Sequence, residues 1–335
     1  MTGTRTEQDL IGERQVPADR YFGIQTLRAL ENFEITRIPI SHYPQFIDAL
    51  AYVKKAAALA NQQLDLIEPQ VASAIIQTCD EILDGGLHAE FVVDAIQGGA
   101  GTSTNMNANE VIANRANQIL GGKLGKYDQV HPINHVNMSQ STNDVYPTAL
   151  RLALHTKLDG LLEEMTALQA EFARKGSEFD DVIKMGRTQL QDAVPMTLGQ
   201  AFDAYAVTIG EDVQRVTEAQ VLIRELNMGA TAIGTGLNAH PMYAVVVTQK
   251  LCDLTGIPVT TSANLVEATQ DTGAYVQLSG VLKRVAVKLS KICNDLRLLS
   301  SGPRAGLNEI NLPRMAPGSS IMPGKVNPII PEVVN

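Results

Sequence analysis

Four short stretches of the sequence place glycines beside hydroxyl and carboxamide side chains. They are QGGAGTSTNMNANE at 97–110, NMSQSTND at 137–144, GRTQLQDAVP at 186–195 and GSSIMPGKVNP at 318–328. Hydroxyl and amide groups are uncharged hydrogen-bond donors, which hold carboxylate oxygens without fully neutralising them. The same residue types cap helices and form turns, so any one stretch alone has a purely structural explanation. Four of them, each longer than a cap requires, favour a binding site.

The stretch at 318–328 adds two adjacent hydroxyls and one cation to this pattern. Prolines at 317, 323 and 328 and glycines at 318 and 324 oppose both helix and strand. We therefore expect an irregular loop. Such a loop can close over a substrate, exclude water during the reaction and then open again.

Long helices are expected to position these stretches. Apolar residues recur at spacings of three and four over 154–172 and 281–299, and a third helix is expected over 197–226. Helices of roughly 25–35 residues span about 40–50 Å and usually lie side by side in a bundle. Before residue 140, shorter helices alternate with Gly- and Asn-rich loops. The sequence thus predicts a mainly α protein with a mixed helical domain at 1–140 and a long-helix bundle domain at 141–335.

The expected helix length constrains how one site can be assembled. Stretches at opposite ends of a helix about 45 Å long cannot meet around one small molecule within a simple bundle. Either the chain doubles back, or several subunits contribute to one site. We favour the second arrangement, which predicts a closed homo-oligomer.

Composition excludes several classes of protein. A net charge of −9 argues against nucleic-acid binding, and no run of about 18 apolar residues is present to span a membrane. The polar start carries no secretory signal, and three separated cysteines without a CxxC pair indicate reduced thiols in the cytoplasm. His131 and His135 have metal-like spacing but lack carboxylate partners, so no metal site is expected. The GTG at 234–236 lacks a dinucleotide-binding context, so dinucleotide binding is not expected.

In order and spacing, the four stretches resemble the fumarase/aspartase superfamily, whose signature loop GSSIMPGKVNP matches. The resemblance covers essentially the whole chain, beginning with GERQVPADRYFGIQTLRALENFEI at 12–35. Within the superfamily, QGGAGTSTNMN, QSTND and VNPIIPE are closer to the aspartase branch than to the fumarases. The resemblance implies a three-domain α fold with a twenty-helix core in a homotetramer and active sites shared between subunits. Because superfamily members continue beyond the signature loop, we expect the C-terminal part of the family fold, including its C-terminal domain, to be absent from this chain.

The resemblance also implies reversible anti-elimination of ammonia from L-aspartate to give fumarate. Ser319 matches the catalytic base, with a turn cap as the alternative role. Lys325 is otherwise a solvated surface charge, and Arg28, a further candidate anion ligand, is equally well explained by a surface salt bridge. The remaining residues that match substrate ligands are Thr102, Ser141, Thr142, Asn143, Thr188, Gln189, Ser320, Lys325 and Asn327.

Gln189 is an informative departure within this resemblance. Fumarases and some aspartases read GRTH where this chain reads GRTQ. A carboxamide binds ligands but takes up no proton near neutral pH, so Gln189 is neither an acid nor a base. This favours loss of ammonia over loss of water. The alternatives are fumarate hydratase, another fumarate-forming lyase, or an inactive truncated fragment of such a lyase.

Overall fold

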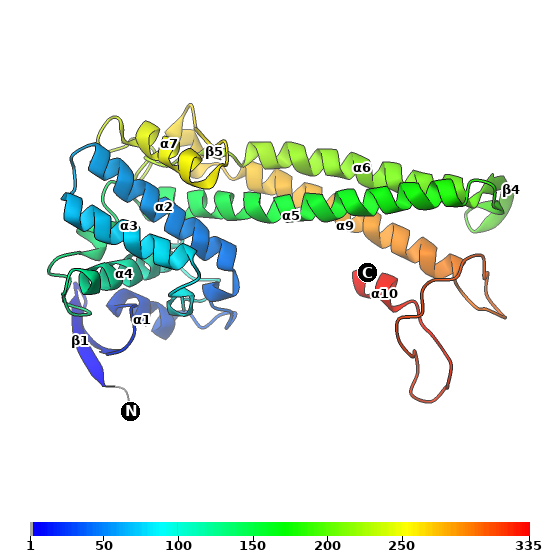
Figure 1. The fold of residues 1–335 in the computed structure, drawn as a ribbon, viewed down its shortest axis with the longest axis horizontal. Coiled ribbons are helices and arrows are strands. Elements are labelled where there is room, and N and C mark those ends of the chain that lie inside the picture. Colours follow the sequence, from blue (N-terminus) through cyan, green and yellow to red (C-terminus); the bar gives the residue numbers. More distant parts are fainter. Residues whose placement is uncertain (1–2, 99) are drawn as a thin grey trace. The chain divides into compact units, whose positions relative to one another are not determined.

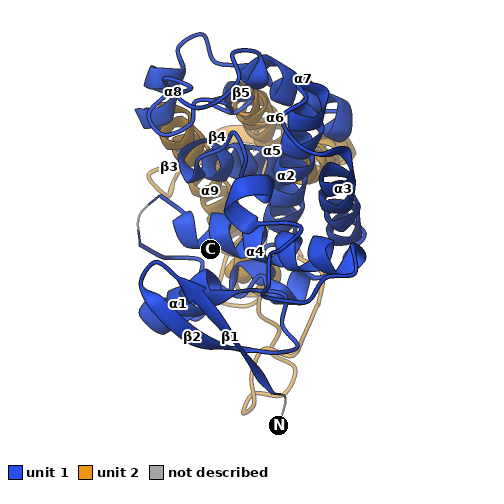
Figure 2. Cartoon of the chain, turned by 90° about the vertical axis from the view of Figure 1, so that its left-hand side faces the viewer, with its two compact units in different colours: residues 1–157, 222–272 blue, residues 158–221, 273–335 orange. Residues whose placement is uncertain are grey.

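A computed structural model describes residues 3–98 and 100–335 of the chain. The described chain forms two compact units, distinguished by colour in Figure 2. Unit 1 runs up to Lys157 and includes Leu222–Thr272, whereas unit 2 comprises Leu158–Val221 and Gly273–Asn335. The division falls inside a long helix rather than at residue 140, and a later segment returns to unit 1. The two units therefore differ from the two consecutive segments expected from the sequence.

Helices make up most of both units, which confirms the expected mainly α fold (Figure 1). The helical elements of unit 1 are α1 (Ile24–Asn32), η1 (Ile40–His42), α2 (Pro44–Gln63), α3 (Pro69–Leu83), η2 (His88–Glu90), α4 (Thr102–Ile119), η3 (Pro132–Val136), the start of α5 (Thr142–Glu178), α7 (Tyr243–Thr255) and α8 (Leu265–Gln270). Unit 2 contains the rest of α5, almost all of α6 (Leu198–Leu222), α9 (Gly273–Leu299) and α10 (Ile329–Val334).

In the described part of the chain, three two-stranded sheets accompany the helices, and none of them was predicted from the sequence. Two are antiparallel hairpins, formed by β1 (Thr4–Asp9) with β2 (Gly12–Pro17) and by β3 (Ile183–Thr188) with β4 (Gln191–Thr197). The third pairs β5 (Glu225–Leu226) in parallel with β6 (Thr260–Thr261). These strands are short, so their alternating patterns are weak in the sequence.

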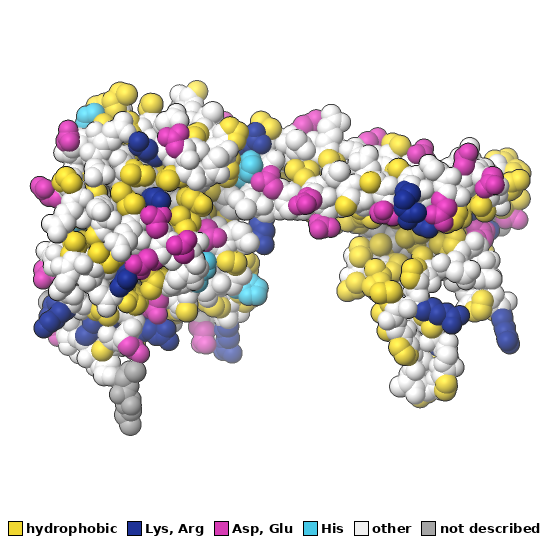
Figure 3. All heavy atoms as spheres, viewed as in Figure 1, with side chains coloured by type: hydrophobic (Ala, Val, Ile, Leu, Met, Phe, Trp, Pro, Cys, Tyr) yellow, Lys and Arg dark blue, Asp and Glu magenta, His cyan; other side chains and the backbone are white. Residues whose placement is uncertain are grey.

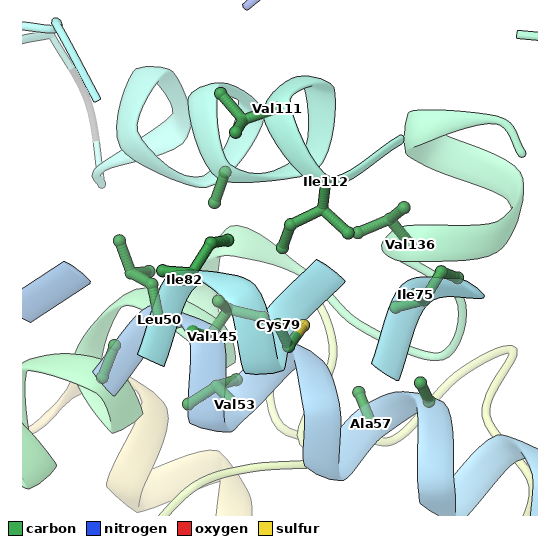
Figure 4. Packing of buried hydrophobic residues seen from close by; sticks show 14 of the residues in the cluster. Leu50, Val53, Ala57, Ile75, Cys79, Ile82, Val111, Ile112, Val136 and Val145 are labelled. Carbon is green, nitrogen blue, oxygen red and sulfur yellow. The ribbon is translucent and has the colours of Figure 1, made fainter. Parts of the chain in front are cut away.

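The core of unit 1 lies among α2, α3 and α4 (Figure 4). Pro44 and Pro69 occupy the first turns of α2 and α3, where the missing N–H of proline costs no helical hydrogen bond. Alanines along α2 let the neighbouring helices approach closely. The buried side chains of this core that Figure 4 labels include Leu50, Val53 and Ala57 of α2, Ile75, Cys79 and Ile82 of α3, and Val111 and Ile112 of α4.

Helix α4 corrects an expectation, because most of QGGAGTSTNMNANE was expected to form a loop. The helix begins at Thr102 and is buried although it is rich in asparagine. Asn107 shows why: its carboxamide accepts the N–H of Val92 and donates to the carbonyl of Glu90. Buried carboxamides that satisfy loop backbone in this way are stable in an interior. The other buried asparagines of α4 are Asn105, Asn109, Asn114 and Asn117.

The long helices of unit 2 confirm the three helices predicted from sequence. Phe172 of α5 packs on Tyr205 of α6 with ring centroids 5.6 Å apart, and the Tyr205 hydroxyl donates to Asp295 of α9. Helix α9 buries one narrow stripe of residues spaced seven apart, namely Leu278, Val285, Ile292 and Leu299. Within the described residues, no helix is both long enough and apolar enough to cross a membrane.

Candidate active site

The predicted binding residues of NMSQSTND lie at the start of α5 in unit 1. Ser141 accepts the Asn143 N–H at its hydroxyl, and Asp144 accepts the Ser141 N–H at 2.9 Å. These reciprocal bonds form a capping box that fixes the first turn of the helix. The turn is half-buried, and the N–H groups at a helix N-terminus attract anions. Such a turn suits a carboxylate group, and binding of a substrate by these residues stays a prediction.

The buried carboxylate of Asp144 connects this turn to the loop at 229–231. One of its oxygens accepts the N–H groups of Gly229 and Thr231, at 3.2 and 2.9 Å, while the other holds Ser141. Burial raises the pKa of Asp144 to about 6, although these N–H groups and the charge of Lys54 act in the opposite direction. The carboxylate thus ties the loop at 229–231 to the start of α5.

Lys54 of α2 is a fully buried cation beneath the same turn. Its ammonium donates to the side-chain oxygens of Asn105, Gln140 and Asn137, at 2.7, 2.9 and 3.0 Å. Three acceptors match the three N–H groups of an ammonium ion. Burial lowers the pKa of Lys54 to about 7, and the charge of Asp144 opposes that effect. Lys54 was not among the residues predicted from the sequence, although its neighbours in AYVKKAAALAN are almost entirely apolar.

The start of α4 lies against α5, which brings two of the predicted stretches together. Gly101 precedes Thr102 with a left-handed φ of 89°, and a Cβ on it would lie 2.2 Å from the Tyr146 ring of α5. Only glycine fits there. Thr102 is exposed at the first residue of α4, and Asn105, one turn later, donates to the Thr142 hydroxyl at 3.2 Å.

Asn143 and Arg28 have structural contacts of their own in unit 1. The Asn143 amide donates to the carbonyl of Ala232 at 2.8 Å. Arg28 makes a bidentate ion pair with Asp9, at 2.7 and 2.8 Å, and also donates to the carbonyl of Gly12. Arg28 therefore makes a salt bridge, as the alternative interpretation expected. Substrate binding by Asn143 or by Arg28 stays a prediction.

In unit 2, GRTQLQDAVP lies in the β3–β4 hairpin, which was not predicted from the sequence. Thr188 ends β3, and Gln189 and Leu190 form the two-residue turn with positive φ angles of 54° and 63°. Two left-handed residues match the twist of a hairpin but usually require glycine or asparagine. The backbone at Gln189 is therefore strained, and both Thr188 and Gln189 are exposed at the tip.

The stretch at 318–328 contains neither helix nor strand, as the sequence predicts. The Ser319 hydroxyl oxygen accepts the N–H groups of Ile321 and Met322, at 3.3 and 3.2 Å. Asn327 donates from its amide to the Gly318 carbonyl, which closes the base of the loop. Ser320 and Lys325 are exposed on the loop.

Glu309 connects the hairpin to the segment that precedes this loop. It pairs with Arg187, the neighbour of Thr188, and lies 3.5 Å from the Lys184 ammonium. The hydrogen bond from Arg187 holds the pKa of Glu309 below its usual range, although burial acts against it. Sequence reasoning missed Glu309, because nothing in the pattern pairs residues 187 and 309.

The two histidines of HPINHVN act within their own turn. The His131 ring accepts the N–H groups of Ile133 and Asn134, and the His135 ring accepts the His131 N–H. Burial lowers the pKa of both imidazoles. Across residues 3–98 and 100–335, no group of three or more His, Cys, Asp or Glu side chains is arranged to hold a metal ion.

The predicted residues thus fall into two sets, one in each unit. Comparison with known proteins places them in a family: a family model described as lyase matches residues 12–335. The chain belongs to this lyase family. Among the relatives of this lyase, the aspartate ammonia-lyase of Helicobacter pylori is 61% identical over 331 residues, which are 99% of this chain and 71% of that protein. The aspartate ammonia-lyase of Escherichia coli K12 is 55% identical over 332 residues, covering 99% of this chain and 70% of that protein.

Solved structures share the fold of this lyase. A fumarate lyase:delta crystallin from Brucella melitensis bound to cobalt is 58% identical, with a TM-score of 0.95 over 99% of this chain and 72% of that one. A class II fumarase from Schistosoma mansoni gives the same TM-score and the same coverage at 37% identity. The mainly helical fumarase/aspartase-type fold expected from the sequence is therefore confirmed.

Proposed function

We propose that this lyase catalyses the reversible elimination of ammonia from L-aspartate to give fumarate. The observation that carries the proposal is the 55–61% identity to aspartate ammonia-lyases over nearly the whole chain. The donor-rich turns at the starts of α4 and α5 support it, because they suit the carboxylates of a small dicarboxylate substrate. The reaction needs no organic cofactor.

The difficult step is removal of a proton from the carbon beside a carboxylate. The C–H bond breaks, its electron pair spreads into that carboxylate, and the C–N bond then breaks to release ammonia. Fixed donors directed at the carboxylate oxygens stabilise the transition state, and each is worth about 3 kcal/mol. We assign this role to Thr102, Ser141, Thr142 and Asn143 in unit 1, and to Thr188, Gln189, Ser320, Lys325 and Asn327 in unit 2.

We assign the base to Ser319. A serine accepts a proton from carbon only when its alkoxide form is stabilised. The two N–H groups that already point at the Ser319 oxygen, from Ile321 and Met322, supply part of that stabilisation. Lys325, six residues further along the same loop, supplies a positive charge.

Assembly and location belong to the same proposal. We propose that the protein works as a homotetramer in the cytoplasm and that each active site combines residues of several subunits. The structure's long helices support this arrangement, because α5 alone runs from Thr142 to Glu178. Sizing the protein in solution tests the tetramer.

Fumarate hydratase is the second candidate, favoured by the likeness to a class II fumarase. Gln189 argues against it, because a carboxamide cannot activate water as an imidazole can. Fumarate absorbance after addition of L-aspartate or L-malate separates the two activities. Turnover of L-aspartate supports the proposal, whereas turnover of L-malate alone would reject it. If neither substrate reacts, the protein is inactive as it stands.

A further inference from the structure

We propose that Lys54 is a positioning residue that fixes the direction of the hydrogen bonds reaching the substrate site, through Asn105 to Thr142. The inference rests on the proposed function, because it names Thr142 as a donor to a substrate carboxylate. Lys54 and Asn105 are buried, with 0% and 2% of their surfaces exposed, whereas Thr142 is half-buried. Neither buried residue touches the substrate itself.

The relay begins with Lys54, which carries only donors. Its ammonium lies 2.7 Å from the side-chain oxygen of Asn105. If the Asn105 amide rotated by half a turn, its NH₂ group would face the ammonium with no acceptor between them. Burial makes such a donor–donor contact costly. Lys54 thus holds Asn105 in one orientation.

That orientation directs the Asn105 NH₂ group toward the active-site turn. It donates to the Thr142 hydroxyl at 3.2 Å and to the Asn137 oxygen at 3.0 Å. Asn137 cannot reverse its own amide either, because its oxygen also receives Lys54 and Asn109. The hydrogen bonds from Lys54 through Asn105 to Thr142 therefore all run in one fixed direction.

Thr142 is the end of the relay. Because its oxygen receives a hydrogen bond from Asn105, its own proton must point elsewhere. A hydroxyl proton is what a carboxylate oxygen requires, since the carboxylate is an acceptor only. If the direction of the hydrogen bond between Asn105 and Thr142 were reversed, the Thr142 hydroxyl would donate to Asn105 and present a lone pair to the substrate. Lys54 thus makes Thr142 a donor at the substrate site.

The decisive variant is Asn105→Asp, which is nearly the same shape but accepts hydrogen bonds only. It keeps the contact with Lys54 as an ion pair and forces the Thr142 proton inward. We expect the KM for L-aspartate and the Kd for fumarate to rise about 10- to 100-fold, as for loss of a hydrogen bond to a charged group. We expect kcat to fall as well, because the same donor also stabilises the transition state in the proposed reaction. A purely structural role for the cluster predicts an unchanged KM in a folded protein, which would overturn the inference.

A double-mutant cycle with Thr142→Val separates the relay from simple charge repulsion. Thr142→Val alone is expected to fold and to raise KM by a similar factor, and an unchanged KM in this variant would also overturn the inference. In the Thr142→Val background, Asn105→Asp should add less than about twofold, because both changes remove the same donor. A full second increase would show that the new charge acts directly and would reject the relay.

Gln118→Glu is the matched control, because it adds the same charge at an exposed position of α4. It should leave KM within about twofold of the wild-type value. Calorimetric binding of fumarate distinguishes failure of the inference from failure of the proposed function. Wild-type protein that binds fumarate but does not convert L-aspartate rejects only the proposed function, whereas wild-type protein that binds no fumarate overturns both.

Discussion

The two sets of predicted site residues are built in different ways. In unit 1, the turn at Ser141–Asn143 rests on buried polar side chains that are bonded to one another, chiefly Lys54, Asn105 and Asp144. In unit 2, the hairpin tip and the stretch at 318–328 are largely exposed. Figure 3 shows apolar side chains on the surface of unit 2. In the stretch at 318–328, the exposed apolar side chains include Ile321, Met322 and Val326.

This difference corresponds to a division of labour in the proposed reaction. Donors that hold a carboxylate must stay in place, which requires a buried and fully bonded support. A base on a loop that admits substrate must move, and exposed segments with few buried contacts open most easily. We therefore expect changes in unit 1 to cost stability and changes on the loop to cost turnover.

The largest expected effect is that of Ser319→Ala on turnover. Loss of the base should lower kcat by roughly 10²- to 10⁴-fold. The urea midpoint should change little, because the Ser319 hydroxyl oxygen accepts N–H groups of its own loop, from Ile321 and Met322. Ser320→Ala is the comparison variant: it removes a proposed donor but not the base, so its kcat should fall less than that of Ser319→Ala. Near-normal turnover by a folded Ser319→Ala protein would remove the base assignment.

Lys54→Met is expected to lower the stability of the fold, in contrast to Ser319→Ala, which lowers turnover. The change leaves Asp144 buried without the nearby positive charge and leaves the side-chain oxygens of Asn105 and Gln140 without the donor that Lys54 supplies. Leaving a buried charge uncompensated in this way typically costs about 3–5 kcal/mol, which urea unfolding measures. Lys55→Met removes the neighbouring lysine, which pairs with the partly exposed Asp80, and should cost about 1 kcal/mol or less. Equal losses for the two variants would contradict the contrast drawn between the units.

The sequence predicted the parts of this lyase in which apolar residues recur at regular spacings. It did not predict the parts that depend on contacts between residues far apart in the chain. The helices over 154–172 and 281–299 follow from apolar residues spaced three and four apart, and the irregular loop at 318–328 follows from its prolines and glycines. The helix α4 could not be predicted in this way, because its buried face consists of asparagines. Their stability depends on loop backbone that only the fold brings near.

The candidate site shows the same limit. Ser319 and Thr142 could be selected because motifs carry them, and their roles in catalysis and binding stay predictions. Lys54 and Glu309 act through partners that are 51 and 122 residues away in the chain, namely Asn105 and Arg187. A single sequence holds no sign of such pairs. The strain at Gln189 was equally hidden, because a hairpin turn without glycine or asparagine looks like an ordinary loop.

A smaller effect than that of Lys54→Met is expected from adding one methyl group where α4 meets α5. Gly101→Ala would place a Cβ 2.2 Å from the Tyr146 ring, at a φ of 89°. Gly85 has the same φ of 89° but nothing within 4 Å, so Gly85→Ala measures the conformational cost alone, about 1 kcal/mol. Gly101→Ala should cost about 1–3 kcal/mol more and should raise KM, because it displaces Thr102. If both variants unfold at the same urea concentration, the contact between α4 and α5 does not support the site.

The smallest effect concerns Glu309, which joins two otherwise exposed segments of unit 2. The hydrogen bond from Arg187 lowers the folded-state pKa of Glu309 below its ordinary value of 4.5. Because the folded state then binds the proton less tightly than the unfolded chain, this contribution is fully present above pH 4.5. It is lost as the pH falls through the folded-state pKa. Glu309→Gln should therefore lower the free energy of unfolding by about 0.5–1 kcal/mol at pH 7, and its difference from the wild type should shrink in acid.

Urea midpoints measured at pH 7 and at pH 3 test this dependence, with Glu163→Gln on the exposed surface of α5 as the control. The control should follow the wild type at both pH values. KM should rise modestly in Glu309→Gln, because the hairpin that carries Thr188 and Gln189 loses its tie to the segment before Ser319. A stability difference that persists unchanged at pH 3 would show that the Glu309 side chain acts through packing rather than charge. In that case the hairpin is held by its own strand pairing, and unit 2 supports its site residues more firmly than the comparison with unit 1 implies.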